Sequence, residues 1–144
     1  VGVSEDVAHT VKVIAVNAYG VQSSAAAESG TPSADTTPPA QPPTINAQGR
    51  EKGFLVTVTP PGDADLAAIR LYEALSTETF SEAVPVDRIA AMPNGDPVRF
   101  TREGIDGGET RRYYATAFDR SGNESSAAGP AAAVALFESV SEAV

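Results

Sequence analysis

The sequence predicts an all-β protein: an antiparallel seven-stranded β-sandwich preceded by a β-hairpin. Three observations favour this fold class. Short runs alternate apolar with polar residues, which is the pattern of a half-buried strand. Proline and glycine separate these runs. No segment keeps a helical spacing of apolar residues over the length of an ordinary helix.

The strand candidates differ in strength. Residues 54–59 are dense in β-branched and apolar side chains and end at Pro-Pro-Gly, as a strand that enters a turn does. Residues 69–73 and residues 113–118 alternate apolar with polar positions. The weaker candidates, each flanked by glycine or proline, are residues 44–47, 98–100 and 131–136.

One connection is too long for a tight turn. Residues 76–97 lie between two strand candidates and carry several apolar side chains. A long connection in a compact domain is usually packed against the core rather than free. We expect a packed loop there, with a short helical turn over residues 87–91.

The chain contains an internal repeat. Residues 15–26 match residues 117–128 without a gap at an offset of 102, and six of the twelve positions are identical, including a glycine and two serines. The same offset pairs the expected inner-face residues of the two copies: Tyr113, Ala115 and Ala117 with Val11, Val13 and Ala15. We expect residues 1–31 to be the C-terminal part of a preceding domain of the same type, whose beginning lies outside this sequence.

A proline-rich segment follows the first copy. Residues 32–43 hold five of the eleven prolines and no larger apolar side chain. Proline fixes φ and restricts the residue before it, so this segment predicts an extended, semi-rigid linker. We expect residues 44–137 to form the complete domain and residues 138–144 to begin a further element.

Composition narrows the range of partners. Ten basic against nineteen acidic residues give a net charge of −9, which makes nucleic acid and anionic membrane surfaces poor partners. The longest apolar run, residues 131–137, is too short to cross a bilayer, so we expect no membrane insertion. The absence of cysteine excludes disulfides, thiolate metal sites and cysteine nucleophiles.

The chain resembles the fibronectin type III family. The stretches that carry the resemblance are residues 60–72, 104–110 and 113–126, together with residues 9–29 for the end of a preceding domain. The resemblance implies that residues 113–126 include the sixth strand, a hairpin and the start of the seventh strand. Two positions depart from the family. Val58 stands where a tryptophan is usual, and Arg111, or His9 in the other copy, stands where the sixth-strand tyrosine is usual. A lighter core is therefore expected, together with a corner hydrogen bond that is either absent or replaced.

Catalysis finds little support in the sequence. His9 is the only histidine, and in an extended segment it points away from the face that carries Asp6. We therefore expect no enzymatic activity, no cofactor and no bound metal. Asp63 and Asp65 resemble part of a calcium loop, to which Asp119, Asn123 and Glu124 could contribute, but turn-forming acids exposed to water are the favoured interpretation.

A binding surface is the second interpretation of the same residues. Tyr72 and Phe80 are aromatic side chains near the loops, and Tyr114, Phe118 and Arg120 alternate outward from the expected core face. Such outward residues more often cover a neighbouring domain. The binding candidates are Asp63, Asp65, Tyr72, Phe80, Asp119, Arg120, Asn123 and Glu124.

The leading functional hypothesis is a non-catalytic spacer. The Asp-Thr-Thr-Pro-Pro linker resembles linkers between tandem domains in tail-tip, or host-specificity, proteins of tailed phages and gene transfer agents. The resemblance implies a place in a virion tail or outside the cell, neighbouring domains of the same chain as partners, a homo-oligomeric full-length protein, and a bacterial surface receptor bound by more distal parts. The alternatives are a module that binds a surface glycan or protein, and an accessory domain of a secreted bacterial polysaccharide-degrading enzyme.

Overall fold

The computed structural model describes residues 7–139 of the chain. The chain divides into two compact units, Val1–Thr36 and Thr37–Val144. In the described part of the first unit, strands β1 (His9–Val13) and β2 (Ala26–Gly30) form one antiparallel pair. The described part of the second unit contains seven strands in two antiparallel sheets.

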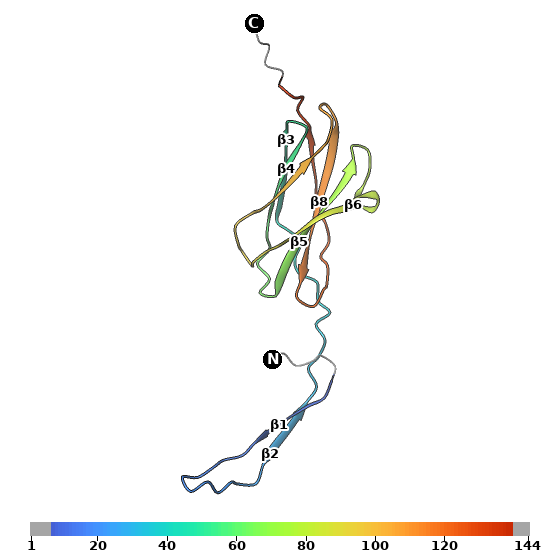
Figure 1. Ribbon diagram of the computed structural model, residues 1–144. Helices are drawn as coiled ribbons and strands as arrows, with labels where there is room; N and C mark the ends of the chain where they lie inside the picture. Colours follow the sequence, from blue (N-terminus) through green and yellow to red (C-terminus); the bar gives the residue numbers. More distant parts are fainter. Residues whose placement is uncertain (1–6, 140–144) are drawn as a thin grey trace. The chain divides into compact units, whose positions relative to one another are not determined.

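The second unit is a β-sandwich, as Figure 1 shows, with β3 and β4 in one layer and β5, β6 and β8 in the other. The three-stranded sheet has the order β3-β4-β7: Thr44–Arg50, Gly53–Thr59 and Val98–Glu103. The four-stranded sheet has the order β6-β5-β8-β9: Val84–Ala90, Leu66–Leu75, Thr110–Asp119 and Ala128–Val134. The predicted fold class, an antiparallel seven-stranded sandwich of fibronectin type III-like form, is confirmed.

The core lies between the two sheets and is built from alternate residues of their strands. Phe54 and Tyr113 pack edge to face, with ring centroids 5.4 Å apart. Val58, where the resemblance to the family implies a tryptophan, is fully buried in the same core. The expected inner face of β8 is confirmed, because the residues of β8 that belong to the core between the sheets are these three: Tyr113, Ala115 and Ala117.

The long connection between β5 and β7 corrects one expectation. Residues 87–91 do not form a helical turn; Val84–Ala90 is strand β6, which pairs with the free edge of β5. The helical turn lies earlier, as a 3₁₀ turn at Phe80–Glu82. It begins with a capping box, in which the Thr79 N–H donates to the carboxylate of Glu82 over 2.8 Å. The Thr-x-x-Glu spacing that marks this turn was present in the sequence.

The two copies of the repeat form the same turn. The Ala15 N–H donates to Ser23 Oγ over 3.0 Å, and the Ala117 N–H donates to Ser125 Oγ over 2.9 Å. In return, the serine N–H donates to the alanine carbonyl over 2.8 Å in the first copy and 2.9 Å in the second. The same two hydrogen bonds therefore join the alanine to the serine in both copies.

The residue that opens each turn also acts alike in both copies. Oδ1 of Asn17 and of Asp119 accepts a hydrogen bond from the backbone N–H four residues later, over 3.0 and 2.8 Å. Their carbonyl oxygens accept from the N–H of Gly20 and Gly122, over 3.0 and 3.4 Å. Both glycines have a positive φ, 80° and 90°, a conformation that a residue with a Cβ rarely adopts. The repeat detected in the sequence is thus also a structural repeat.

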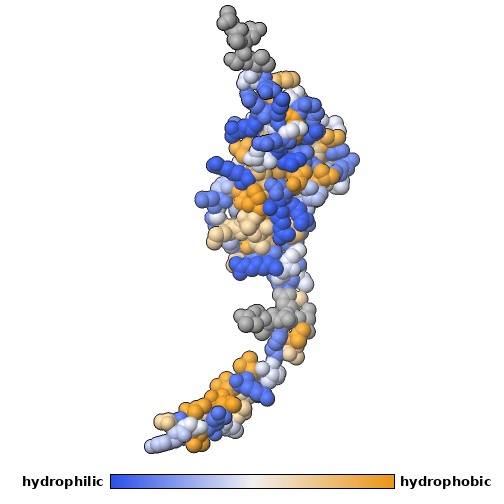
Figure 2. All heavy atoms as spheres, viewed as in Figure 1, coloured by the Kyte–Doolittle hydropathy of each residue, from blue (hydrophilic) through white to orange (hydrophobic). Residues whose placement is uncertain are grey.

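Burial separates the two copies. Every residue from 14 to 30 is exposed, and the side chains of Val11 and Val13 are 66% and 65% exposed. Figure 2 shows hydrophobic residues on the surface of the first unit. In the second copy, Ala117 and Asp119 are 0% and 2% exposed. One turn is therefore built twice, once against a core and once without one.

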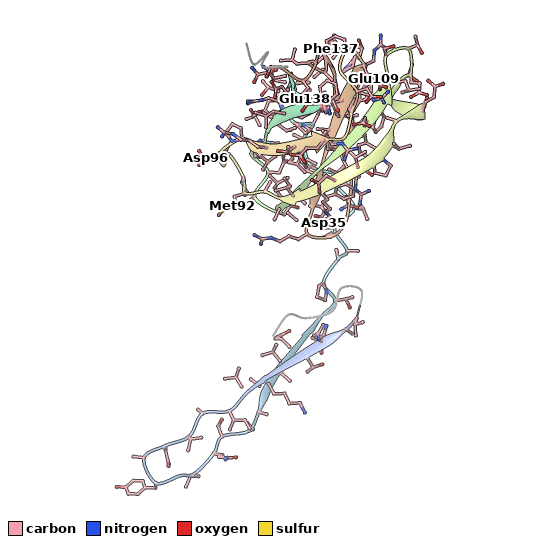
Figure 3. The ribbon with its side chains drawn as sticks, turned by 45° about the horizontal axis from the view of Figure 1, so that its top comes forward. Asp35, Met92, Asp96, Glu109, Phe137 and Glu138 are labelled. Atoms are coloured by element: carbon pink, nitrogen blue, oxygen red, sulfur yellow. The ribbon has the colours of Figure 1, made fainter. Side chains whose placement is uncertain are left out.

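The chain after β9 returns to the β3–β4 turn. The Leu136 N–H donates to the carbonyl of Arg50 over 2.9 Å, and Glu138 forms a 2.6 Å salt bridge with Lys52. Phe137, Glu138 and Glu109 lie at one end of the second unit (Figure 3). Of the tail expected over residues 138–144, residues 140–144 lie outside the described residues. Among the residues described, no helix has the length and apolar character needed to span a membrane.

Candidate functional site

The predicted site residues fall into two groups. One group occupies the turns at the end of the sandwich where β5 begins and β8 ends: Asp63, Asp65, Asp119, Arg120 and Asn123. The other group lies on the outer face of the β6-β5-β8-β9 sheet: Tyr72, Phe80 and Glu124. The turns are close together, since Leu66 pairs with Asp119 and the Arg120 N–H donates to the Asp65 carbonyl over 3.0 Å.

Asp119 differs from the expectation that these acids face water. Its side chain is buried, and Asn123 donates to it twice, from the backbone N–H over 2.8 Å and from Nδ2 over 2.7 Å. Burial opposes ionisation of Asp119, but the hydrogen bonds from Asn123 and from the backbone of Gly122 and Ser121 outweigh it, so its pKa lies below the usual value. The carboxylate of Asp119 therefore stabilises the turn that follows β8.

Asp63 also has a local partner. Its Oδ2 accepts a hydrogen bond from the Ala40 N–H over 3.0 Å, which ties the loop before β5 to the start of the second unit. Its carbonyl accepts from the Leu66 N–H over 3.0 Å, closing the turn into β5. This acid acts as a turn-forming residue, the kind of role that its sequence context favours.

The outer face of the four-stranded sheet carries an aromatic cluster. Phe80 packs against Tyr72 and Tyr114, with ring centroids 5.0 and 5.5 Å apart. Tyr72 Oη donates to Glu124 Oε1 over 2.5 Å, and Thr116 Oγ1 donates to the same oxygen over 2.7 Å. Burial, followed by the hydrogen bond to Glu124, raises the pKa of Tyr72.

The loop before β6 holds Phe80 over this cluster. The carbonyl of Glu78 accepts hydrogen bonds from Arg112 Nη1 over 3.2 Å and from Tyr114 Oη over 3.4 Å. Phe80 remains 37% exposed, whereas Tyr114 is 6% exposed beneath it. The loop therefore covers most of the aromatic surface that could otherwise contact a ligand.

The outward strip expected from Tyr114, Phe118 and Arg120 does not form. Phe118 is 7% exposed, because the guanidinium groups of Arg70 and Arg88 stack over its ring at 4.4 and 4.8 Å. Arg120 lies in the turn beyond the end of β8 rather than on the strand. The correction has a physical reason: residues on neighbouring strands, far away in sequence, lie over the outward positions of β8.

A half-buried ionic network was missed in the sequence. Glu73 Oε2 accepts from Tyr113 Oη over 2.9 Å and from Arg102 Nε over 3.1 Å. Arg111, at the family's tyrosine position, pairs with Glu109 over 2.5 Å. Burial and the bond to Glu73 raise the pKa of Tyr113. The available signal was an acid, Glu73, at an inner-face position of a strand.

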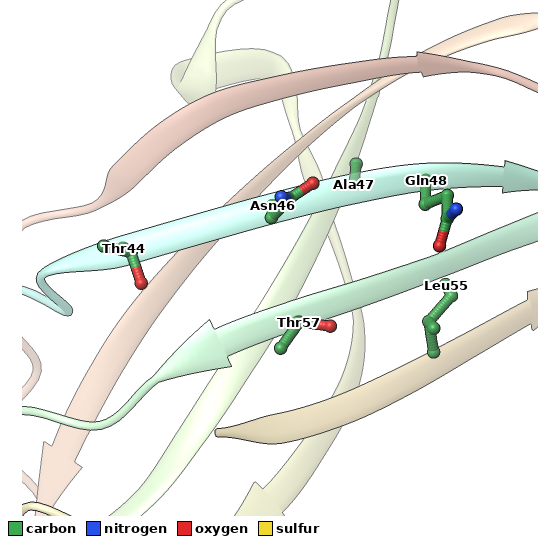
Figure 4. A pocket seen from close by; sticks show the side chains of 6 residues that line it. All are labelled: Thr44, Asn46, Ala47, Gln48, Leu55 and Thr57. Carbon is green, nitrogen blue, oxygen red and sulfur yellow. The ribbon is translucent and has the colours of Figure 1, made fainter. Parts of the chain in front are cut away.

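The outer face of the three-stranded sheet carries a shallow groove of about 540 Å³ (Figure 4). The residues that line it are Thr44, Asn46, Ala47, Gln48, Leu55 and Thr57. None of these side chains is charged, and four of the six end in a hydroxyl or an amide. This groove could not be predicted from the sequence, because alternate polar residues on an edge strand are ordinary for a sandwich.

Comparison with known proteins supports the fold. No protein-family model matches the sequence, and no curated protein matches it. The FN1–FN3 domains of chicken CNTN1, a fibronectin type III region, align with 13% identity and a TM-score of 0.54, over 93% of this chain and 44% of that one. A β-1,2-glucanase from Parabacteroides distasonis aligns with 20% identity and a TM-score of 0.54, over 85% of this chain and 17% of that one.

The chain thus spans less than half the length of either solved chain. Identities of this size show the fold alone. The seven-strand sandwich, its sheet order and these two likenesses lead to one conclusion: the chain has a fibronectin type III-like fold.

Proposed function

We propose that the chain is a non-catalytic structural module that spaces and orients neighbouring parts of a larger protein. One observation carries the proposal: the side chains that looked most suited to binding are used to stabilise the sandwich itself. Asp63 and Asp119 hold turns, and Glu124 joins Tyr72 to Thr116. A module whose candidate groups are internally committed is suited to a mechanical role.

A domain exchange in the full-length protein tests this role. Residues 44–137 are replaced by an unrelated β-sandwich of the same length, or are deleted. If the module is a spacer, the exchange should preserve the attachment of the full-length protein to its target, and the deletion should impair this attachment. Loss of attachment on exchange would instead favour a module that binds through its own surface, because only the spacing is kept.

In its finer form, the proposal places the module in a tail-tip, or host-specificity, protein of a tailed phage or gene transfer agent. Its support is the proline-rich linker of residues 32–43, which suits a stiff connection between tandem domains. The module would orient distal parts that bind a bacterial surface receptor, in a homo-oligomeric protein of the virion tail or the cell exterior. Electron microscopy of particles labelled with an antibody against residues 44–137 tests this location.

A second candidate function is an accessory domain of a secreted polysaccharide-degrading enzyme. Two observations favour it: the fold recurs within a bacterial β-1,2-glucanase, and the groove on β3 and β4 offers uncharged hydroxyl and amide groups, which suit a neutral sugar. Carbohydrate sites usually add an exposed aromatic ring, and the six residues lining the groove include none.

Affinity electrophoresis through gels that contain a β-1,2-glucan tests the second candidate. If the groove binds the glucan, migration of the chain should be retarded, and the double substitution Asn46→Ala with Gln48→Ala should abolish this retardation. The control is Ser81→Ala, an exposed position in the loop between β5 and β6. Unchanged migration of the unmodified chain at every glucan concentration would contradict this function and leave the spacer proposal intact.

A further inference from the structure

The apolar side of the first hairpin reproduces a surface that the second unit buries. At the offset of the repeat, Val11, Val13 and Ala15 correspond to Tyr113, Ala115 and Ala117. The shared turn places the two sets on equivalent positions, because the pairs Val13–Ala26 and Ala115–Ala128 keep the same register. The strands diverge only beyond Ala128, where β8 and β9 shift register.

The second unit shows what covers this face. Strand β5 pairs antiparallel with β8 along its length, and β3, β4 and β7 form the opposing layer. Phe54, Val56 and Phe100 from that layer belong to the same core as Tyr113. Within the described residues of the first unit, β1 pairs with β2 alone, so its other edge and its apolar face are open.

An isolated two-stranded hairpin is marginal in water, and its open edge invites pairing with another strand. We infer that residues 9–30 are the last two strands of a second sandwich, and that their apolar face and the open edge of β1 bind a five-stranded segment with the chemistry of β3–β7. That segment offers an edge strand like β5 and an apolar layer like β3-β4-β7. The inference goes beyond the spacer role and does not depend on it.

A second copy of this chain is not the occupant. Its strand β5 already pairs with its own β8 and β6, so both edges of that strand are taken. Its core face is filled by its own Tyr113, Ala115 and Ala117, which are 0% exposed. The second unit of another copy could cover the apolar face of the hairpin as β3–β7 cover β8 only by opening its own sandwich. The occupant is therefore a separate segment of the length of Thr44–Glu103.

An extended chain tests the inference. A copy of residues 37–108 is joined directly ahead of Val7 in place of residues 1–6, so that β1 follows the added strands at the distance at which β8 follows β7. The probe is a single cysteine, Ala15→Cys, in a sequence with no other cysteine. The inference predicts that the extension slows labelling of this thiol by a water-soluble reagent at least about tenfold, because labelling then requires local opening.

The matched control carries Val56→Asp and Phe100→Asp in the added copy only, which removes the apolar layer, and labelling should stay fast. A variant of the first hairpin, Val11→Tyr with Val13→Ala, carries the residues that β8 has at the equivalent positions. Slower labelling of the unsubstituted hairpin, and not of the control, supports the inference. Slower labelling of the substituted hairpin alone overturns it, because the face of Val11 and Val13 then does not bind. Equal rates in all chains overturn it. A slow-labelling, dimeric unextended chain also overturns it, in favour of a second copy.

Discussion

The hairpin of residues 15–26 and the hairpin of residues 117–128 have the same turn in opposite surroundings. Both close through a serine hydroxyl, an Asn or Asp side chain and a glycine of positive φ. Yet the first is exposed throughout, and the second ends a strand with 0% exposure at Tyr113 and Ala117. Local hydrogen bonds are thus specified within a dozen residues, whereas burial depends on strands from elsewhere.

The largest expected effect separates the two hairpins directly. Ala117→Asp should unfold the second unit, because an unpaired carboxylate in the core costs roughly 3 kcal/mol or more, a large part of a domain's stability. The equivalent change in the first hairpin, Ala15→Asp, should leave the thermal midpoint unchanged. Circular dichroism melting measures both. Equal destabilisation by the two changes would mean that the face of β1 is already covered.

A smaller loss of stability is expected when the Phe80 ring, which covers the outer face of β8, is removed. Phe80→Ala should destabilise the second unit by about 1 to 2 kcal/mol, less than a fully buried phenylalanine, because the ring is 37% exposed. Denaturant unfolding gives the value. Phe137→Ala is the control, since that ring is 75% exposed and should cost little. Matching losses would show that the aromatic cluster adds no stability.

Asp119→Asn gives the second turn the residue of the first, Asn17, and tests how charge contributes. The pKa of Asp119 is lowered in the folded state, so its ionised form stabilises the fold above the ordinary aspartate pKa of about 4. This contribution is lost as the pH falls through the folded-state pKa. The variant should therefore melt a few degrees lower at neutral pH, and the gap should close in acid. A gap that is constant with pH would contradict this account.

Removing residues 1–36 should hardly move the midpoint of the second unit. A proline-rich linker transmits few contacts, and the two units are separately compact. Differential scanning calorimetry of the chain and of residues 37–144 makes the comparison. A drop of more than a few degrees would show that the first hairpin stabilises the sandwich, and the contrast between the two hairpins would then need another explanation.

The smallest effect is expected from calcium. The carboxylates of Asp63 and Asp119 already accept hydrogen bonds from the chain, so millimolar calcium should leave the thermal midpoint unchanged. A saturable rise would indicate binding to the folded state. If Asp63→Asn with Asp65→Asn removed that rise, the turns would hold a cation, and the interpretation of these acids as turn formers would be wrong.

The strands and the inner face of β8 could be predicted because each is a local pattern. The strand at residues 54–59 and the face of Tyr113, Ala115 and Ala117 follow from composition and a period of two, with which Gly53–Thr59 and the buried positions agree. Strand β6 could not be predicted in this way. Its residues became a strand because β5 offered a free edge for pairing.

The candidate site was predictable only in its turns. The Asp and Asn residues beside glycine mark turns by their own chemistry, and the structure has them there. The covering of Phe118 by Arg70 and Arg88, and the bonds of Glu73 to Arg102 and Tyr113, join strands that are distant in sequence. No local spacing encodes which side chains meet across a sheet.

The sequence by itself determined the all-β class, the repeat and the turn that both copies share, because those depend on alternation, proline, glycine and hydrogen bonds over a few residues. Tertiary structure alone decided which copy has a core. Tyr113 is buried and Val11 is exposed because burial is a property of packed partners. Strand β5 pairs with β8, and residues of β4 and β7 share its core, whereas the described residues of the first unit supply β1 with β2 only.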